Sequence, residues 1–354
     1  MQNLDLVVTY TEVDARSANS SSRINTPFKK SGTANTNNLL YEYFLLACSE
    51  ASIKAALSTS NEIIGPGKFS CYWVYSNKKW TKVLQEAQSK LLYMRFTPTT
   101  KEQKAKLNLL LSSPSIKIYP SPVLTKLFKD KFATYKKFSD ISIPTVLIGE
   151  FTNNNFSNAL SELKKIFKKH KNTNDFSESV VIKDQFGAAG HNVIQANLKE
   201  SFASIAKKLK NENKSGDTIS YILQPYIECA SLVDGIKNAP SDLRVMFLNN
   251  RIVDCYARVA KTGDFRTNSH RGGKMITLTK FNKDQLDIQE ISQKLANKIT
   301  IPHSLFSLDF IKSINGNIYL VEANSAPGLD WDRKTEKKFK KLIVDVVSEL
   351  KHLV

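Results

Sequence analysis

The sequence predicts an α/β protein built from several α+β lobes. Its 354 residues are too many for one ordinary domain and suit two or three packed lobes. Segments with strand alternation and segments with helical spacing follow one another along the chain. Hydrophobic residues make up 41% and charged residues 24% of the chain, which is typical of a soluble globular protein.

No apolar run comes near the ~18 residues that a membrane span needs. The first residues, Met1 to Asp5, lack the basic stretch and the long apolar core of a secretion signal. We therefore expect a cytoplasmic protein with no membrane partner. The four cysteines, Cys48, Cys71, Cys229 and Cys255, form no Cys-x-x-Cys pair, which favours reduced packing cysteines over a zinc site or a disulfide framework.

Residues 1–120 are expected to form an N-terminal domain. In it we expect strands over 5–10, 69–75 and 91–96 and helices over 39–57 and 101–111. Residues 14–37 are poor in large apolar side chains and rich in Ser, Asn and Thr, so they cannot bury much surface. We expect a mobile loop there, and it either folds onto a bound peptide or is a spacer.

A second part begins near Ser121 and divides into a central lobe, 121–223, and a C-terminal lobe, 224–354. In the central lobe we expect helices over 124–138 and 156–169 and strands over 145–148, 179–183 and 221–224. In the C-terminal lobe we expect strands over 243–248, 251–258, 308–311 and 318–322 and helices over 285–296 and 335–353.

The net charge of +18 is the one unusual bulk property. A basic surface attracts polyanions, nucleotides or acidic peptides over long range. The alternative is a general composition bias, because Lys and Asn are abundant everywhere in the chain. The Lys-rich stretch Lys337 to Lys341 is open to the same two interpretations, a polyanion site or a solvated helix face.

Three oxygen-bearing side chains fall on two neighbouring strand patterns. Asp309 lies in the first, and Glu322 and Asn324 lie two residues apart in the second, so alternation points both to one face. Carboxylate and amide oxygens suit Mg²⁺, with phosphate oxygens and water filling its other positions. The alternative is that Asp309 and Glu322 are ordinary solvent-facing strand residues.

A lysine and a glycine-rich loop follow the strand at 179–183. Lys183, with Gly187 to Gly190 after it, would place an ammonium group and backbone N–H groups around a phosphate chain. The glycines could equally form a hairpin only. The pattern differs from a P-loop, because no Gly-Lys-Ser/Thr follows.

Arginines gather in the next part of the chain. Arg244 and Arg258 lie on expected adjacent strands, and the segment Phe265 to Gly273 carries Arg266, Asn268, His270 and Arg271. Guanidinium groups fit carboxylates and phosphates bidentately, so the segment reads as a loop over an anionic ligand. Nucleic-acid binding and plain surface salt bridges are the alternatives.

In this order, the motifs resemble the ATP-grasp superfamily, and within it the RimK-like ligases and the glutathione synthetases. The resemblance covers about 121–329 and the closing helix, and residues 1–120 carry no motif that matches clearly. It implies an ATP-grasp fold with an N-terminal α/β pre-ATP-grasp domain, a central lobe and a C-terminal lobe.

The resemblance also implies roles for single residues. Lys131 and Lys183 match the two lysines that reach the nucleotide phosphates. The remaining matches are the phosphate loop Gly187, Ala188, Ala189 and Gly190; the adenine hinge Gln224, Pro225, Tyr226 and Ile227; the ribose-associated Asp242; the catalytic Arg244, Arg258, Arg266 and Asn268, acting with Lys183; and the magnesium ligands Asp309, Glu322 and Asn324. Pro225 departs from the family, which usually has an acidic residue there, and Glu228 could supply the missing carboxylate.

The implied activity is a ligase that uses ATP and magnesium, with two ions expected and manganese as an alternative, to join a carboxylate to an amine through an acyl phosphate. Its substrate would be an amino acid, a peptide or a protein, with an acidic one favoured by the net charge. A basic nucleic-acid-binding protein, a kinase-like phosphotransferase and a non-catalytic nucleotide binder are the rivals. The sequence lacks the Asp-Phe-Gly motif that a kinase-like phosphotransferase would need. No segment of it resembles a module that reads nucleic-acid bases. The sequence leaves open whether the protein forms a homodimer.

Overall fold

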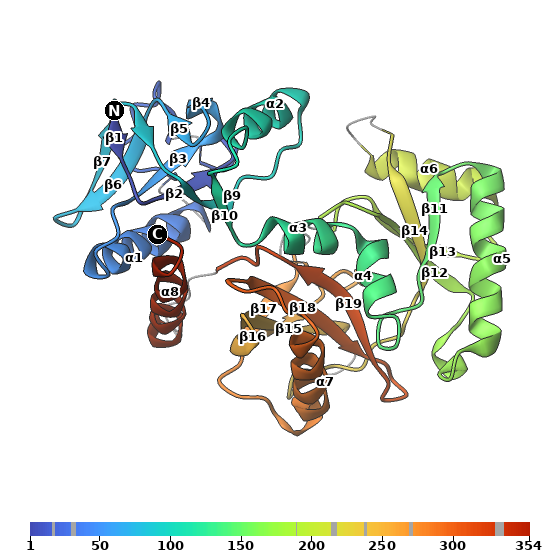
Figure 1. Ribbon diagram of the computed structural model, residues 1–354. Helices are drawn as coiled ribbons and strands as arrows, with labels where there is room; N and C mark the ends of the chain where they lie inside the picture. Colours follow the sequence, from blue (N-terminus) through green and yellow to red (C-terminus); the bar gives the residue numbers. More distant parts are fainter. Residues whose placement is uncertain are drawn as a thin grey trace. The chain divides into compact units, whose positions relative to one another are not determined.

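The computed structural model describes residues 1–15, 18–29, 33–188, 190–213, 218–236, 239–268, 272–329 and 336–354. The chain divides into two compact units (Figure 1). The N-terminal unit comprises 1–122, 301–305 and 326–354, and the central unit comprises 123–300 and 306–325. No helix in the described ranges is long and apolar enough to cross a membrane.

The N-terminal unit is built around a six-stranded sheet. Its order is β10 (Lys117–Tyr119), β9 (Leu91–Arg95), β2 (Leu6–Tyr10), β3 (Ala55–Thr59), β6 (Tyr72–Ser76) and β7 (Lys79–Val83). The first four strands are parallel to their neighbours, and the last two are antiparallel. All five residues of β2 are buried, as expected of a central parallel strand covered on both faces.

Helices and a small second sheet complete this unit. They are α1 (Thr33–Glu50), α2 (Lys101–Leu110), α8 (Glu336–Lys351), the 3₁₀ turn η2 (Ser60–Glu62), and the four-stranded sheet of β1 (Gln2–Asn3), β8 (Ala87–Gln88), β5 (Lys68–Phe69) and β4 (Ile63–Gly65). Helices α1 and α8 lie side by side. The expected division assigns α8 to the C-terminal lobe, but its buried stripe of Phe339, Ile343 and Val347 places it in the N-terminal unit.

The segment 14–37 packs more closely than its composition suggests. Phe28 is buried, and its ring lies 5.0 Å from that of Tyr10 and 5.9 Å from that of Tyr41. The side chain of Asn38 accepts a bond from the Phe28 N–H and donates one to the Phe28 carbonyl. Helix α1 begins at Thr33, six residues before the expected start, and ends at Glu50, because the last part of the expected helix belongs to strand β3 (Ala55–Thr59). Residues 16–17 and 30–32 lie outside the described part, so mobility of the segment stays a prediction.

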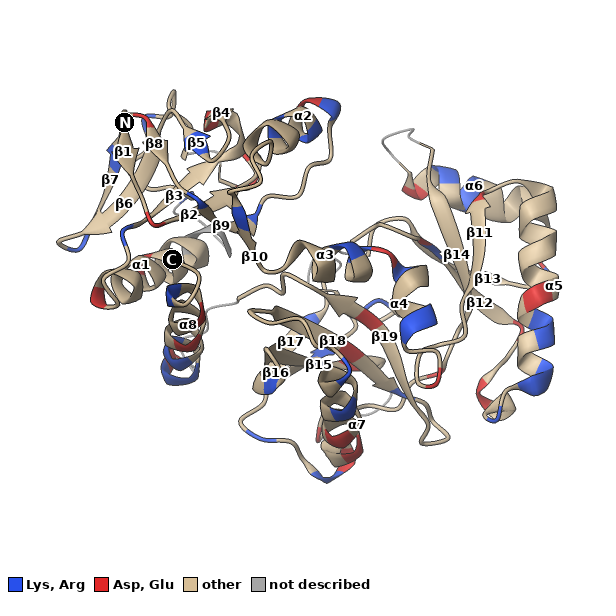
Figure 2. Ribbon diagram, viewed as in Figure 1, with Lys and Arg blue, Asp and Glu red and all other residues tan. Residues whose placement is uncertain are grey.

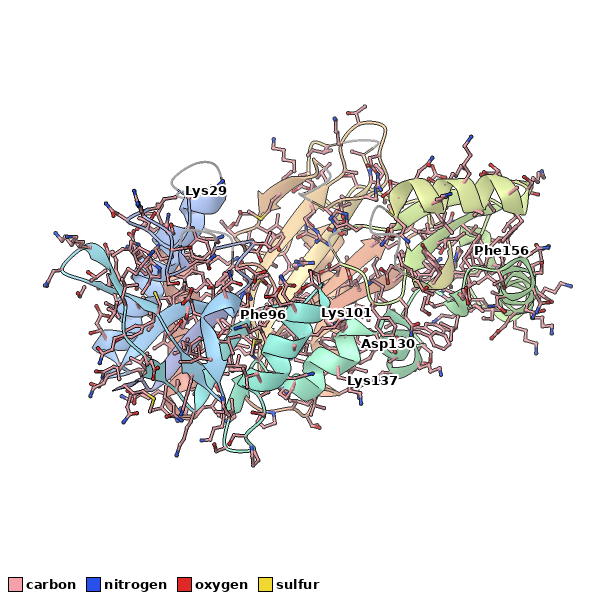
Figure 3. All side chains as sticks on the ribbon, turned by 90° about the horizontal axis from the view of Figure 1, so that it is seen from above. Lys29, Phe96, Lys101, Asp130, Lys137 and Phe156 are labelled. Atoms are coloured by element: carbon pink, nitrogen blue, oxygen red, sulfur yellow. The ribbon has the colours of Figure 1, made fainter. Side chains whose placement is uncertain are left out.

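The first sheet of the central unit has antiparallel strands with two helices on one face (Figure 1). Its order is β11 (Val146–Glu150), β14 (Ser220–Pro225), β12 (Ser179–Asp184) and β13 (Val193–Asn197). Helices α5 (Asn153–Lys169) and α6 (Phe202–Glu212) bury Phe156, Leu163 and Ile205 against it. Figure 3 labels Phe156 on α5. The other face of this sheet therefore stays available for a site.

The second sheet of the central unit has five strands. They run in the order β17 (Lys274–Thr277), β16 (Arg251–Val259), β15 (Ser241–Leu248), β18 (Leu305–Lys312) and β19 (Ile318–Asn324). The other elements of the unit are α3 (Pro122–Lys129), α4 (Lys131–Lys137), α7 (Leu286–Asn297) and the 3₁₀ turns η3 (Thr173–Asp175) and η5 (Lys283–Gln285). Asp130 caps the start of helix α4, and Lys137 is the last residue of the helix; Figure 3 labels both.

A buried carboxylate links η3 to the hairpin of β18 and β19. Asp175 accepts bonds from Tyr319 at 2.6 Å and from Asn315 and Asn317, both at 2.8 Å. Burial alone would raise the pKa of Asp175, but these bonds, with that of Tyr319 the strongest, lower it on balance. The central lobe is thereby held to the strands that carry the predicted magnesium ligands.

Candidate active site

A cavity of about 130 Å³ lies within the central unit and is lined by both of its sheets. Most of the predicted site residues line it: Lys131, Lys183, Gly187, Ala188, Gly190, Gln224, Pro225, Tyr226, Ile227, Asp242, Arg258, Arg266, Asn268, Asp309 and Glu322. Arg244 and Asn324 are not in its lining, and Ala189 lies outside the described residues. Residues far apart in the sequence thus meet in one place.

Strand alternation places the lysine and the hinge on the cavity face of the first sheet. In β12, Val180 and Ile182 pack against the helices, whereas Val181 and Lys183 line the cavity. In β14, Leu223 faces the helices and Gln224 faces the cavity. Burial lowers the pKa of Lys183 to about 8, with nearby Glu322 opposing and Lys131 adding to the shift.

The glycine-rich loop is held close to the first lysine. The ammonium group of Lys131 donates to the carbonyl of Gly187 and lies 3.7 Å from Glu322. A Cβ on residue 187 would lie 2.8 Å from the Cβ of Asp184, so only glycine fits there. Asp184 in turn accepts a bond from the Phe186 N–H at 2.8 Å. The loop is therefore shaped by a close backbone approach and is more than a simple hairpin.

Acidic and basic side chains of the second sheet alternate and bind one another. We call this set the charge chain, and its members are Arg244, Asp309, Arg258 and Asp242. Cross-strand register pairs Asp242 with Arg258 and Asp309 with Glu322. Arg258 binds Asp242 bidentately at 2.8 and 2.5 Å and also reaches Asp309 at 2.7 Å. Arg244 binds Asp309 bidentately at 2.7 and 2.6 Å, so it holds a site residue although it does not line the cavity.

These pairs fix the charge states of the buried groups. Burial alone would raise the pKa of Asp309, but Arg244 and Arg258 together hold it below its ordinary value. Burial likewise opposes the guanidinium charge of Arg244 and Arg258, while Asp309 raises the pKa of both on balance. Both ion pairs are buried, so removing one partner would leave an uncompensated charge.

The loop before β17 lies against both sheets of the cavity. Arg266 binds Asp264 at 2.9 Å and donates to the Val193 carbonyl of the first sheet at 3.3 Å. Thr267 donates to Asp242 at 2.6 Å. In this state, Arg266 is engaged by protein groups, whereas we expect it to hold an anionic ligand. His270 and Arg271 of the predicted loop lie outside the described residues.

The predicted magnesium set has two carboxylates and one amide. No group of three His, Cys, Asp or Glu side chains that could hold a metal ion occurs in the described ranges. The Oδ1 atom of Asp309 accepts one bond, so one of its lone pairs is left, whereas Oδ2 accepts two. The Nδ2 atom of Asn324 is buried without a partner. The donor set therefore fits one hard cation bound through Asp309 Oδ1 and Glu322.

The hinge shows where one sequence-based interpretation is wrong. Glu228 is exposed and does not line the cavity, so it cannot replace the acidic residue that the family has at position 225. Asp242, by contrast, lines the cavity together with the hinge residues. Gln224 is held by a 2.8 Å bond from its Nε2 to Thr145, and the Tyr226 N–H donates to the Ser179 carbonyl at 2.9 Å.

Comparisons with known proteins show the family of this chain. Residues 149–347, more than half of the chain, match the RimK-like ATP-grasp domain. The chain belongs to the RimK-like ATP-grasp family.

The chain is also similar to named relatives of this family and to solved structures of ATP-grasp ligases. A Pasteurella multocida protein named probable alpha-L-glutamate ligase is 29% identical over 157 residues, covering 44% of this chain and 43% of that protein. The chain spans about half the length of the curated relatives it matches. D-alanine–D-alanine ligase from Bacillus anthracis, complexed with ATP, has a TM-score of 0.57 at 10% identity and covers 100% of this chain and 98% of its own.

A third protein of similar fold is an ATP-grasp ligase from Chryseobacterium gregarium, described as RiPP-associated and solved with ADP and a leader and core peptide. It has a TM-score of 0.53 at 15% identity, and the match covers 99% of this chain and 98% of that one. At these identities the likeness shows the fold alone, and it confirms the expected ATP-grasp architecture.

Some residues of this RimK-like site were missed by sequence reasoning. Thr267 and Asp264 hold the loop, yet neither was singled out beside Arg266. Gln185 binds Asp130 at 2.8 Å and accepts a bond from Ser220 at 2.7 Å, which positions the start of α4 and Lys131. Their only signal in the sequence is their position: Asp264 and Thr267 adjoin or lie within the arginine-rich segment, and Gln185 lies between Lys183 and Gly187.

Proposed function

We propose that the protein is an ATP- and magnesium-dependent ligase that joins a carboxylate to an amine through an acyl phosphate. The observation that carries this proposal is the meeting, in one cavity, of Lys131 and Lys183 with the Arg258–Asp309–Glu322 face of the second sheet. Cationic groups that hold phosphates therefore lie opposite a donor set that fits a hard cation.

The cavity offers different surfaces to the two ends of a nucleotide. Ile143, Val181, Ile227, Ile311 and Val321 provide an apolar lining that suits a purine base. The lysines and the glycine-rich loop provide charge and backbone groups that suit phosphates. A base that donates to the Pro225 carbonyl and accepts from the Ile227 N–H would not need the N–H that proline lacks.

Asp309 and Glu322 would hold magnesium, with Asn324 as the third predicted ligand, and a second ion or manganese is part of the same proposal. The ion would supply Lewis acidity and would orient the phosphate oxygens. The charge chain would favour binding of the ion, because Asp309 stays ionised and Arg244 and Arg258 hold its carboxylate oxygens in place.

The reaction would proceed in two displacements. A substrate carboxylate oxygen attacks the γ-phosphorus, the bond to the β-phosphate oxygen breaks, and ADP leaves. Lys131, Lys183 and Arg258 offset the negative charge of the two reacting anions. The amine then attacks the acyl carbon, the bond to the phosphate oxygen breaks, and phosphate leaves while the nitrogen loses a proton to solvent. The loop carrying Arg266 and Asn268 would keep water from the acyl phosphate.

The names of the relatives and the net charge of the chain suggest which substrates to test first. The matched relatives carry the name probable alpha-L-glutamate ligase, which makes L-glutamate the first amino acid to test. The net charge of +18 favours an acidic peptide or protein as the partner.

The test measures phosphate release from Mg·ATP with L-glutamate, other amino acids and acidic peptides. We expect release that needs a panel member and that Glu322→Ala abolishes, since this variant loses a proposed magnesium ligand. Glu290→Ala is the matched control, because Glu290 is exposed on α7, outside the cavity, and pairs with the exposed Lys294. Full release in Glu322→Ala would refute the role of Glu322, and failure of the wild-type protein to bind Mg·ATP would refute the proposed function.

A further inference from the structure

The side-chain amide of Gln224 is held at one end only. Its Nε2 atom donates to the Thr145 hydroxyl at 2.8 Å, whereas its Oε1 atom is buried and has no hydrogen-bond partner among the described residues. Gln224 is 5% exposed and lines the cavity of the central unit. Burying an acceptor without a donor is costly and rare in native proteins. The Oε1 atom therefore favours a ligand that brings an N–H group to it.

The hydroxyl of Thr145 decides which end of the amide lacks a partner. Thr145 directly precedes β11, is buried, and donates its single hydroxyl proton to the Ile143 carbonyl at 2.8 Å. Toward Gln224 the hydroxyl oxygen is thus an acceptor. The opposite orientation of the amide would place two acceptors against each other. Thr145 therefore holds the NH₂ end of the amide and leaves the carbonyl end to a ligand.

The backbone of Gln224 is fixed as well as its side chain. In the register of the first sheet, Gln224 lies opposite Val181, and Leu223 before it lies opposite Val146. Pro225 follows directly and restricts Gln224 to the extended conformation that a strand needs. The amide acceptor consequently keeps one position relative to the hinge.

Purine bases differ in the group that they bring to such an acceptor. The 6-amino group of adenine carries two N–H donors, so one can donate to the Pro225 carbonyl and the other to Gln224 Oε1. The 6-oxo group of guanine or hypoxanthine has only lone pairs and would meet acceptors alone. A site built to bind an N–H group strongly rejects an analogue without it, because the buried acceptor then stays without a donor.

We propose that Thr145 is a positioning residue that sets the base preference of the site. By orienting the Gln224 amide, it selects a 6-aminopurine nucleotide over a 6-oxopurine nucleotide. The inference rests on the proposed function, which places a nucleotide in this cavity. Thr145 does not line the cavity itself, so it acts on the base through Gln224. Its substitution therefore changes the ratio of two nucleotide affinities, which a merely structural role would leave unchanged.

A small second cavity beside the hinge provides the rival interpretation. It has about 10 Å³ of space, and its lining includes Thr145, Gln224 and Ser142. The Ser142 hydroxyl is also buried without a partner in the described part of the chain. One water in this space would satisfy both oxygens, since a buried water needs about this much room and two or more polar partners. Under this interpretation Ser142 matters as much as Thr145.

The experiment measures by calorimetry the Kd of three magnesium nucleotides with the full chain. They are ADP, inosine diphosphate and purine riboside diphosphate, which lacks any group at the 6-position. We expect the wild type to bind ADP about a hundredfold or more tightly than the other two.

Three variants of the hinge region then separate the interpretations. Thr145→Val keeps the shape of the side chain but frees the amide to turn, so we expect the ratio of the inosine and adenosine Kd values to fall about tenfold or more. Thr145→Ser keeps the hydroxyl and should retain the wild-type ratio. Ser142→Ala is the matched control and should retain it too. Because the ratio compares two ligands of one protein, a loss of stability alone does not change it, and Thr145→Ala replaces the valine variant if that variant does not fold.

An unchanged ratio in Thr145→Val overturns the role of Thr145, and so does a wild type that binds all three nucleotides equally. An equal fall of the ratio in Ser142→Ala would instead establish the water interpretation. These failures differ from failure of the proposed function. If ADP binds without discrimination, the base selection alone is wrong, whereas absence of any nucleotide binding would overturn the ligase proposal as well.

Discussion

The charged side chains of the second sheet at the cavity bind one another, so none of them acts as an independent ligand. Asp309 is 1% exposed and would be costly to bury alone, yet two arginines reach it and one of them also binds Asp242. The two arginines lower the pKa of Asp309 against the effect of burial, so Asp309 is charged and oriented before any ligand arrives. Since the neighbours compensate one another, a substitution at one position changes the environment of the next.

Arg258 should be the most sensitive member of this chain. Arg258→Met leaves Asp242 without its bidentate partner in a buried setting, so we expect the free energy of unfolding to fall by about 3–5 kcal/mol. Urea unfolding measures this loss. The double variant Asp242→Asn, Arg258→Met should recover part of it, and Arg251→Met on the exposed start of β16 should change little. A loss in Arg258→Met no larger than in Arg251→Met would contradict the role of the ion pairs.

Lys183 should make nucleotide binding depend on pH. Burial lowers the pKa of Lys183 to about 8, so the ammonium form is present below this pH and is lost above it. If the ammonium group contacts a phosphate, the Kd of Mg·ATP rises above pH 8 by up to about tenfold per pH unit. Lys183→Arg keeps its charge through this range, and its profile should be flat. Calorimetric titrations from pH 7 to pH 9.5 test this, and identical profiles in both proteins would refute it.

The loop before β17 depends on the absence of a side chain at one position. A Cβ on residue 273 would lie 2.1 Å from the Thr267 carbonyl oxygen, and the Gly273 N–H donates to the Asn268 carbonyl at 3.2 Å. Gly273→Ala should therefore displace Thr267 from Asp242 and slow phosphate release on the order of a hundredfold. Gly65→Ala is the control, because the backbone there has no positive φ and the added methyl group would meet only the Lys68 side chain, at 3.4 Å or more. Equal rates in the two variants would show that the loop does not need this close approach.

Elements with a strong local pattern were predictable from the sequence. Strands β12, β15, β16, β18 and β19 lie where alternation placed them, because each is a buried strand next to a turn or a bulge. The start of α1 was not predictable, since Thr33 to Asn38 contains no large apolar residue that shows helical spacing. The packing of Phe28 depends on Tyr10 and Tyr41, which are distant in sequence, and no local pattern reveals it.

In the candidate site, too, local features were predictable from the sequence and contacts between distant residues were not. Residue types that bind phosphate or metal stood out in the sequence, and the cavity brings most of them together. Their partners within the protein did not stand out. The bidentate pairing of Arg244 with Asp309 joins strands 65 residues apart, and only the sheet order makes them neighbours. Glu228 shows the opposite error, because a plausible residue type directly after the hinge is exposed and does not line the cavity.

The excess positive charge belongs to the whole molecule. Figure 2 shows Lys and Arg on helices of both units, among them α5 and α8, without one element holding them all. The Lys-rich stretch of α8 is compensated in part, since Lys340 pairs with Glu336 and Lys341 with Asp345. A distributed charge of this kind acts as a long-range field and not as a specific patch.

That field should speed the capture of acidic substrates. With a Glu-rich peptide that supports phosphate release, we expect kcat/KM to fall about tenfold or more between 10 mM and 150 mM salt, because the screening length shortens from ~30 Å to ~8 Å. The value of kcat should stay constant, since screening affects the encounter and not the bound complex. A peptide of equal length with Gln at all but the reacting position is the control, and an equally steep salt dependence for it would rule out steering by the net charge.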